Sequence, residues 1–193
     1  MKKLFPHIAL SLIALQLLLM LGSWIYSAAF PMSGVRSILS GEGLRWLFGH
    51  FAEMLATPQL VWLVLLAMAY GGLRKVFMHA AKPLFRERRA RQMTLLVLLV
   101  YVAVVLLLTV TPHAILLSVT GGLWPSPFSR SLVPMVAFAI ITLSTVYGLL
   151  AGRLDSLADV YDALLDGIRQ AAPLFLFYVL VMQLIETLRF MLP

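Results

Sequence analysis

Long apolar stretches are the dominant pattern along the chain. They form five segments, at about residues 8–30, 58–73, 93–111, 131–151 and 171–188. Crossing the hydrocarbon core of a bilayer takes about 20 helical residues, so each segment is long enough to span it, or nearly so. We therefore predict an all-α, polytopic membrane helix bundle with five transmembrane helices, organised as a single membrane domain over residues 1–193.

The first apolar stretch has the layout of a membrane-targeting segment, because Lys2 and Lys3 lie shortly before it. Its apolar run is longer than the roughly 7–15 residues of a cleaved secretory signal. Trp24 and Tyr26 lie near its end, where aromatic residues are typical of a membrane interface. We interpret the stretch as a retained signal anchor.

Two shorter segments have one apolar and one polar face. In residues 44–55 the apolar side chains recur at helical spacing, which predicts an amphipathic helix in the outer interface that Thr57-Pro58 bends into the membrane. In residues 155–168 an apolar face runs beside a row of aspartates, which predicts an acidic cytoplasmic helix. We expect this helix to loosen at Gly167, before Pro173 begins the fifth span.

Composition agrees with a membrane protein, since 62% of the residues are hydrophobic and the mean hydropathy is +0.97. The chain has no cysteine, which excludes disulfides and thiolate chemistry. No cofactor is indicated.

The formal net charge of +7 is concentrated in one place, the stretch 74–91 between the second and third spans. That stretch holds seven basic residues and a single acid, Glu87, for a net charge of +6. The positive-inside rule places such a loop in the cytoplasm, which puts the N-terminus inside and residues 112–130 outside. We predict a multi-pass protein of a bacterial-type inner membrane whose basic loop contacts anionic lipids, and we do not expect nucleic acid as a partner.

The turn-rich segment 121–128 contains two glycines and two prolines, so it predicts a shaped outer turn. Its aromatic residues Trp124 and Phe128 are interpreted as interface anchors, with a ligand clamp as the alternative.

The four aspartates of the acidic helix are the first candidates for a binding site, because clustered carboxylates hold hard cations. Carboxylates stacked along one helix do not converge, so a solvated face is the favoured interpretation. A further possibility pairs these aspartates with the arginines at 86–91. The four are Asp155, Asp159, Asp162 and Asp166.

Polar residues inside spans mark transport routes, because each is costly in hydrocarbon. In the fifth span we select Gln183 and Glu186 as weak candidates for substrate binding. Glu186 lies three residues before Arg189, so an ion pair on one helix face is the favoured interpretation, and a proton-linked or substrate-contacting carboxylate is the alternative.

Enzymatic activity is not expected, because no nucleophile with a base, pair of convergent carboxylates or metal-ligand spacing is recognisable. The histidines are far apart in sequence, at His7, His50, His79 and His113, and no metal site is predicted.

A family resemblance is carried by a series of short motifs in the second half of the chain. In order, these are Ser126-Pro127-Phe128, Val133-Pro134, Tyr147-Gly148 with Gly152, and the pair Asp155 and Asp159. Their order and spacing resemble the late half of the aminobenzoyl-glutamate transporter (AbgT) family. The segment 35–46, VRSILSGEGLRW, resembles an earlier block of the same family.

The resemblance implies a shortened family member. Family members have an inverted-repeat fold in which two re-entrant hairpins and broken helices carry the substrate site, and we match no residue here to those hairpins. The implied function is a transporter, or a transporter subunit, for aminobenzoyl-glutamate or a related anionic metabolite. The alternative is a non-transporting scaffold or accessory subunit that binds a partner membrane protein.

We also expect membrane lipids as partners and a homo-oligomer or a partner membrane protein beside the chain. The small residues Gly22-Ser23 and Ala137/Ala139 would permit close helix contacts between subunits.

Overall fold

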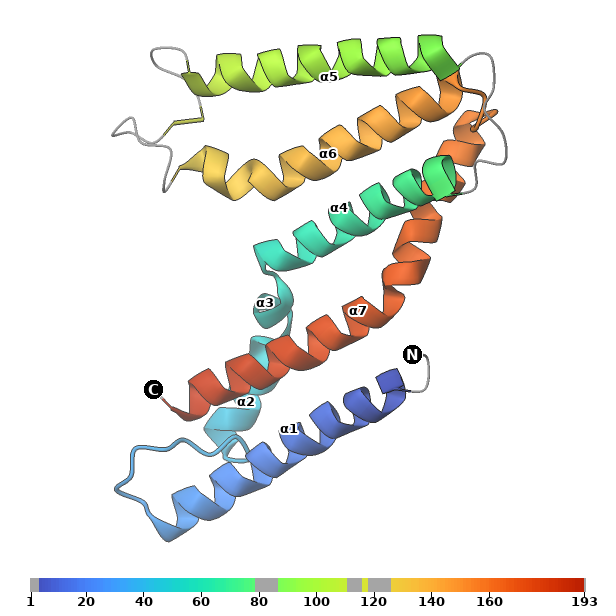
Figure 1. The fold of residues 1–193 in the computed structure, drawn as a ribbon. Helices are drawn as coiled ribbons and strands as arrows, with labels where there is room; N and C mark the ends of the chain where they lie inside the picture. Colours follow the sequence, from blue (N-terminus) through green and yellow to red (C-terminus); the bar gives the residue numbers. More distant parts are fainter. Residues whose placement is uncertain (1–3, 79–86, 111–115, 118–125, 193) are drawn as a thin grey trace. The chain divides into compact units, whose positions relative to one another are not determined.

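The computed structural model describes residues 4–78, 87–110, 116–117 and 126–192. Residues 121–125 of the predicted turn 121–128, with the candidate residue Trp124, and the middle of the predicted basic loop lie outside these residues. The helices are α1 (Leu4–Ala29), α2 (Gly41–Gly49), α3 (Phe51–Leu55), α4 (Pro58–Leu73), a π-helical turn η1 (Arg74–Met78), α5 (Glu87–Val110), α6 (Pro127–Leu150) and α7 (Leu157–Met191) (Figure 1).

The predicted fold class is confirmed, because the elements described are helical and five helices are long and apolar enough to cross a membrane. These five are α1, α4 continued by η1, α5, α6 and α7. Side chains on their surfaces are largely apolar and exposed, as expected of helices that contact lipid tails.

Two compact units make up the chain, and we describe each by itself. Unit 1 combines Met1–Leu60 with Ala172–Pro193. Its core is a cluster of Ile38, Leu47, Met54 and Met191, beside which the rings of Trp46 and Phe190 stack with centroids 4.4 Å apart. Ser40 begins α2 by accepting a hydrogen bond from the Gly43 amide at 3.0 Å.

The predicted helix at 44–55 is interrupted in the structure, where α2 begins earlier, at Gly41, and ends at Gly49. His50 has φ −104° and ψ 7°, outside helical geometry, and α3 starts after it. Apolar spacing does not reveal this break, because the two short helices together keep the same apolar positions. Glycine at the end of α2 lowers the cost of leaving the helix there.

Unit 2 comprises Val61–Ala171, and its long helices α5 and α6 lie side by side and antiparallel (Figure 1). The Tyr101 hydroxyl of α5 donates to the Met135 carbonyl of α6 at 2.8 Å. A second pairing joins α4 to the first turns of α7, where Gly71 and Gly167 bring the two backbones together.

The helices of the structure extend past two of the predicted membrane spans. The basic stretch 74–91 is helical at both of its ends, because η1 extends α4 to Met78 and α5 already begins at Glu87. Arginine, lysine and glutamate are good helix formers, so the helices continue beyond their apolar parts. The predicted acidic helix and fifth span are one helix, α7, with Pro173 inside it.

Length explains how α7 combines both segments. A helix of 35 residues is about 52 Å long, whereas the hydrocarbon core is about 30 Å thick. The acidic first turns of α7 therefore extend beyond the part that spans the membrane. Pro173 removes one backbone donor but does not end the helix, as is common in membrane helices.

Candidate functional site at the charged helix ends

The motif Tyr147-Gly148 with Gly152 ends helix α6 in a defined turn. Gly152 has φ +70°, a left-handed conformation that glycine adopts without a Cβ clash. The Gly152 amide donates to the Leu149 carbonyl at 3.3 Å, and the Arg153 amide donates to the Gly148 carbonyl at 2.8 Å. These two bonds form a Schellman motif, which satisfies the last carbonyls of α6 and reverses the chain toward α7.

Arg153, which follows this turn, joins three elements of unit 2. Its guanidinium donates to the Glu87 carboxylate of α5 at 2.6 Å and to the Val76 carbonyl of η1 at 2.6 Å. The side chains of Arg153 and Glu87 are 15% and 19% exposed, so water screens this ion pair only partly. The guanidinium also lies over the Tyr147 ring, 5.2 Å from its centroid.

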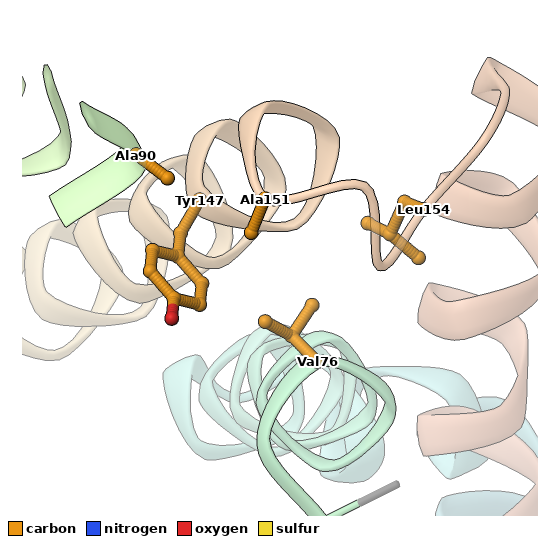
Figure 2. Close-up of a cluster of buried hydrophobic side chains, with 5 residues drawn as sticks. All are labelled: Val76, Ala90, Tyr147, Ala151 and Leu154. Atoms are coloured by element: carbon orange, nitrogen blue, oxygen red, sulfur yellow. The ribbon is translucent and has the colours of Figure 1, made fainter. Parts of the chain in front are cut away.

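An apolar cluster adjoins the ion pair, because two of its members, Val76 and Tyr147, contact Arg153. It consists of Val76, Ala90, Tyr147, Ala151 and Leu154, which Figure 2 draws as sticks. The Tyr147 ring stacks on Phe77 with centroids 5.3 Å apart and planes at 9°. Gly148 has no room for a side chain, since a Cβ there would lie 2.9 Å from Val76 Cγ2 and closer still to Leu154.

Asp159 caps the start of α7 with its carboxylate. Its carboxylate accepts bonds from the Asp155 amide at 3.1 Å and from the Ser156 amide and hydroxyl at 3.0 Å, and the Ser156 hydroxyl accepts from the Asp159 amide. This reciprocal arrangement is a capping box. Lys75 of η1 lies 3.6 Å from the carboxylate and donates to the Asp159 carbonyl.

These bonds change the titration of Asp159, which lies in the acidic first turn of α7, ahead of the spanning part. The Ser156 hydroxyl, followed by the Asp155 amide, lowers the pKa of Asp159 below its ordinary value of 3.8. The charged form is therefore the one that caps α7.

We call this set of residues the charged joint: Lys75, Val76, Glu87, Tyr147, Arg153 and Asp159. It connects η1, α5, α6 and α7 at one end of unit 2. The predicted pairing of the aspartates with arginines 86–91 is not what the described residues show, because Asp159 pairs with Lys75 and Asp166 with Arg169 on its own helix.

The remaining motif residues shape the other end of α6. Ser126 caps the helix in a reciprocal bond with Ser129, and Pro127 occupies its first turn. The Phe128 amide donates to the Leu116 carbonyl at 3.1 Å, and Pro134 lies inside the helix. About 20 residues, or some 30 Å of helix, separate these residues from the charged joint. The motif therefore marks two ends of one helix and not a convergent pocket.

Gln183 and Glu186 belong to unit 1, on the last turns of α7. Glu186 accepts a bond from Arg189 at 2.5 Å, so the carboxylate already has a cationic partner. Thr187, beside it, accepts a bond from Gln16 of α1 at 2.7 Å, and the Gln16 carbonyl oxygen is buried without a partner among the described residues. This polar contact between α1 and α7 was not predicted from sequence.

Arg153 and Glu87 were also missed, although the sequence carried two signals. Glu87 is the only acid in the basic stretch 74–91, and Arg153 follows a glycine at the end of an apolar run. Chemically, the charged joint holds helix ends in place, because its ionisable groups are bonded to one another. The part of the chain that the structure describes holds no group of three metal-binding side chains.

Comparison with known proteins assigns the chain to a family. A family model, described as the AbgT putative transporter family, matches residues 78–191. The match includes Glu87, Tyr147, Arg153, Asp159 and Glu186, and it begins after the earlier block at 35–46, whose resemblance stays a prediction. No curated protein and no solved structure matches the chain. Because the match covers more than half of its residues, the chain belongs to the AbgT family of membrane transporters.

Proposed function

We propose that the chain moves aminobenzoyl-glutamate, or a related anionic metabolite, across the membrane, either alone or as a subunit of a larger transporter. The observation that carries this proposal is the family match over α5, α6 and α7. Catalysis is not part of it, since the family is one of transporters.

The polar residues of unit 1 support a substrate contact. Gln183, Glu186 and Thr187 lie at spacings of three and four on α7, which places them on one helix face. The unpartnered Gln16 carbonyl oxygen adjoins this face through Thr187. Polar groups inside a membrane span are energetically costly unless they bind a ligand or form hydrogen bonds with each other.

Arg189 supplies the positive charge that an anionic substrate requires. In the structure its partner is Glu186. Protonation of Glu186 would leave Arg189 free to bind a substrate carboxylate, since arginine pairs with carboxylates in a bidentate manner. Transport by this route is coupled to protons.

A flux assay tests the proposal directly. The purified full chain is reconstituted in liposomes, and uptake of radiolabelled aminobenzoyl-glutamate is measured with and without a proton gradient. We expect Glu186→Gln to lower proton-driven uptake by about tenfold or more. Asp166→Asn is the matched control, because it removes the same charge from an exposed ion pair on the same helix and should change little. Absence of flux at any protein density would overturn transport by the chain alone.

An accessory or scaffold role is the second candidate, favoured by the way the charged joint uses its ionisable groups to hold helices together. Purification in mild detergent would then recover a stoichiometric partner membrane protein or a homo-oligomer. A monomeric particle that carries substrate without a partner would rule this role out.

Orientation is part of the proposal, with the basic stretch and the N-terminus in the cytoplasm of a bacterial-type cell. The absence of cysteine makes labelling straightforward. A single cysteine at Arg88 should react with an impermeant thiol reagent only after the membrane is opened. Labelling in intact cells would show that the orientation is the opposite of the one proposed.

A further inference from the structure

A groove of about 470 Å³ lies within unit 2, among η1, α5 and α6. Its walls come from the end of α4 and from these three elements, and they include Phe77, Arg91, Leu95, Leu98, Ile140 and Tyr147. A volume of this size is within the range of small-molecule sites. The charged joint contributes only the Tyr147 ring, so the groove is a separate feature.

Apolar side chains make up nearly all of the groove wall. Leu95 is 59% exposed, Phe77 52% and Leu98 36%, so the groove is open along the surface of the helices. Since η1, α5 and α6 belong to candidate membrane spans, this open side faces lipid tails. An acyl chain is the ligand that such a surface meets first.

One end of the groove is cationic. Arg91 lines it and has no ion-pair partner among the residues that the structure describes. Glu87, one helical turn earlier, is already bonded to Arg153 at 2.6 Å and does not neutralise Arg91. The apolar part of α5 starts at Met93, so Arg91 lies where the helix passes from a charged to a hydrocarbon environment.

The surroundings of Arg91 favour a negatively charged ligand. Arg88 and Arg89 are exposed on the same turn of α5, and basic clusters at a membrane surface attract anionic lipids. One turn further along, Thr94 also lines the groove, but its hydroxyl oxygen is buried, so the polar contact available to a ligand at this end is the guanidinium of Arg91.

We propose that this groove binds one acyl chain of an anionic phospholipid, whose phosphate is held by the guanidinium of Arg91. Arginine recognises phosphate with two parallel hydrogen bonds, which a zwitterionic lipid would engage less well because its own ammonium group competes. The site is independent of the transport proposal, and the two succeed or fail separately.

Native mass spectrometry of the purified full chain tests the site, with phosphatidylglycerol and phosphatidylcholine of identical acyl chains as probes. We expect one retained phosphatidylglycerol, bound about tenfold more tightly than phosphatidylcholine. Arg91→Gln should remove this preference, and Arg91→Lys should keep part of it. Arg88→Gln is the matched control, since it removes the same charge from the same turn outside the groove, and it should change binding by less than about twofold.

A second pair of variants tests the groove itself. Leu95→Trp places a bulky ring in the wall and should weaken both lipids, whereas Leu96→Trp, at the neighbouring exposed position outside the wall, should not. Equal binding of the two lipids, equal effects of Arg88→Gln and Arg91→Gln, or no effect of Leu95→Trp would each overturn the proposal. Size-exclusion profiles and circular dichroism establish that each variant is folded. If Arg91→Gln does not fold, the lipid preference of Arg91→Lys tests the role of Arg91 instead.

Discussion

The crossing of α4 and α7 in unit 2 provides a sharp test of the packing. Ala67 and Gly71 on one helix face Ala163 and Gly167 on the other, in the small-xxx-small arrangement that lets membrane helices approach closely. A Cβ added at Gly167 would lie 2.8 Å from the Gly71 nitrogen and 2.9 Å from its Cα, with the Ala67 carbonyl oxygen nearer still. Gly167→Ala therefore forces the two backbones apart.

The size of the effect follows from two opposing terms. Overpacking costs about 1–3 kcal/mol, and the upper end applies because backbone atoms cannot rotate away. Alanine is a better helix former than glycine by about 1 kcal/mol, which offsets part of that cost. The net loss of stability is about 2 kcal/mol. For a chain of this length, this lowers the Tm by about 4–8 °C.

Thermal unfolding in detergent measures the change in Tm, with size exclusion as the readout of the folded fraction. Gly41→Ala is the matched control, because nothing lies within 4 Å of a Cβ at that helical position in α2. It should raise the Tm slightly or leave it unchanged. If Gly167→Ala is as stable as the wild type while Gly41→Ala behaves as expected, the close crossing of α4 and α7 is wrong.

Three further predictions concern the charged joint and the turn at Gly152 that precedes Arg153, and the same unfolding assay tests them. Glu87→Gln should cost about 1–2 kcal/mol, because Arg153 loses a mostly buried partner, whereas Asp166→Asn in an exposed pair should cost less than about 1 kcal/mol; equal losses would contradict this. Gly152→Ala should cost about 1–2 kcal/mol, because alanine is strained at φ +70°, and an unchanged Tm would exclude that turn. Because the pKa of Asp159 is lowered in the folded chain, its capping bonds stabilise the fold fully at a pH above the ordinary pKa of 3.8. This stabilisation is lost as the pH falls through the lowered pKa of the folded state. Asp159→Asn should flatten the dependence of Tm on pH in this acid range, and an unaltered dependence would refute the prediction.

Helices with continuous apolar sequence were predictable because their signal is long and repeated. Even so, α5 and α7 are longer than the membrane spans predicted within them. Arg88 and Arg89 were assigned to the basic loop and Pro173 to the start of the fifth span, although basic residues extend helices and a proline can remain inside one. Apolar content shows where a helix meets hydrocarbon, and this differs from where the helix ends.

Contacts between helices were harder to predict, because apolar residues surround each helix and do not identify the face that meets a partner. The sequence pointed to Gly22-Ser23 as a close contact between subunits, and that remains a prediction. Within the chain Ser23 is buried, and its hydroxyl accepts a bond from the Ile38 amide at 3.3 Å. The crossing at Gly71 and Gly167 has an equally visible spacing, but nothing in the sequence selects one partner over another.

The position of Arg153 explains the role of the Tyr147-Gly148 and Gly152 part of the family motif at the end of α6. The guanidinium bonds Glu87 of α5 and the Val76 carbonyl of η1 through separate nitrogens. A π-helical turn departs from the regular α-helical hydrogen-bond pattern, and Arg153 supplies a donor to its Val76 carbonyl. Lysine would keep the charge but, as a compact ammonium, would not reproduce the planar fork that reaches both acceptors. Gly148 and Gly152 both contribute to this arrangement. Gly148 lets Val76 and Leu154 approach α6 closely, and the turn at Gly152 directs Arg153 toward Glu87 and the Val76 carbonyl.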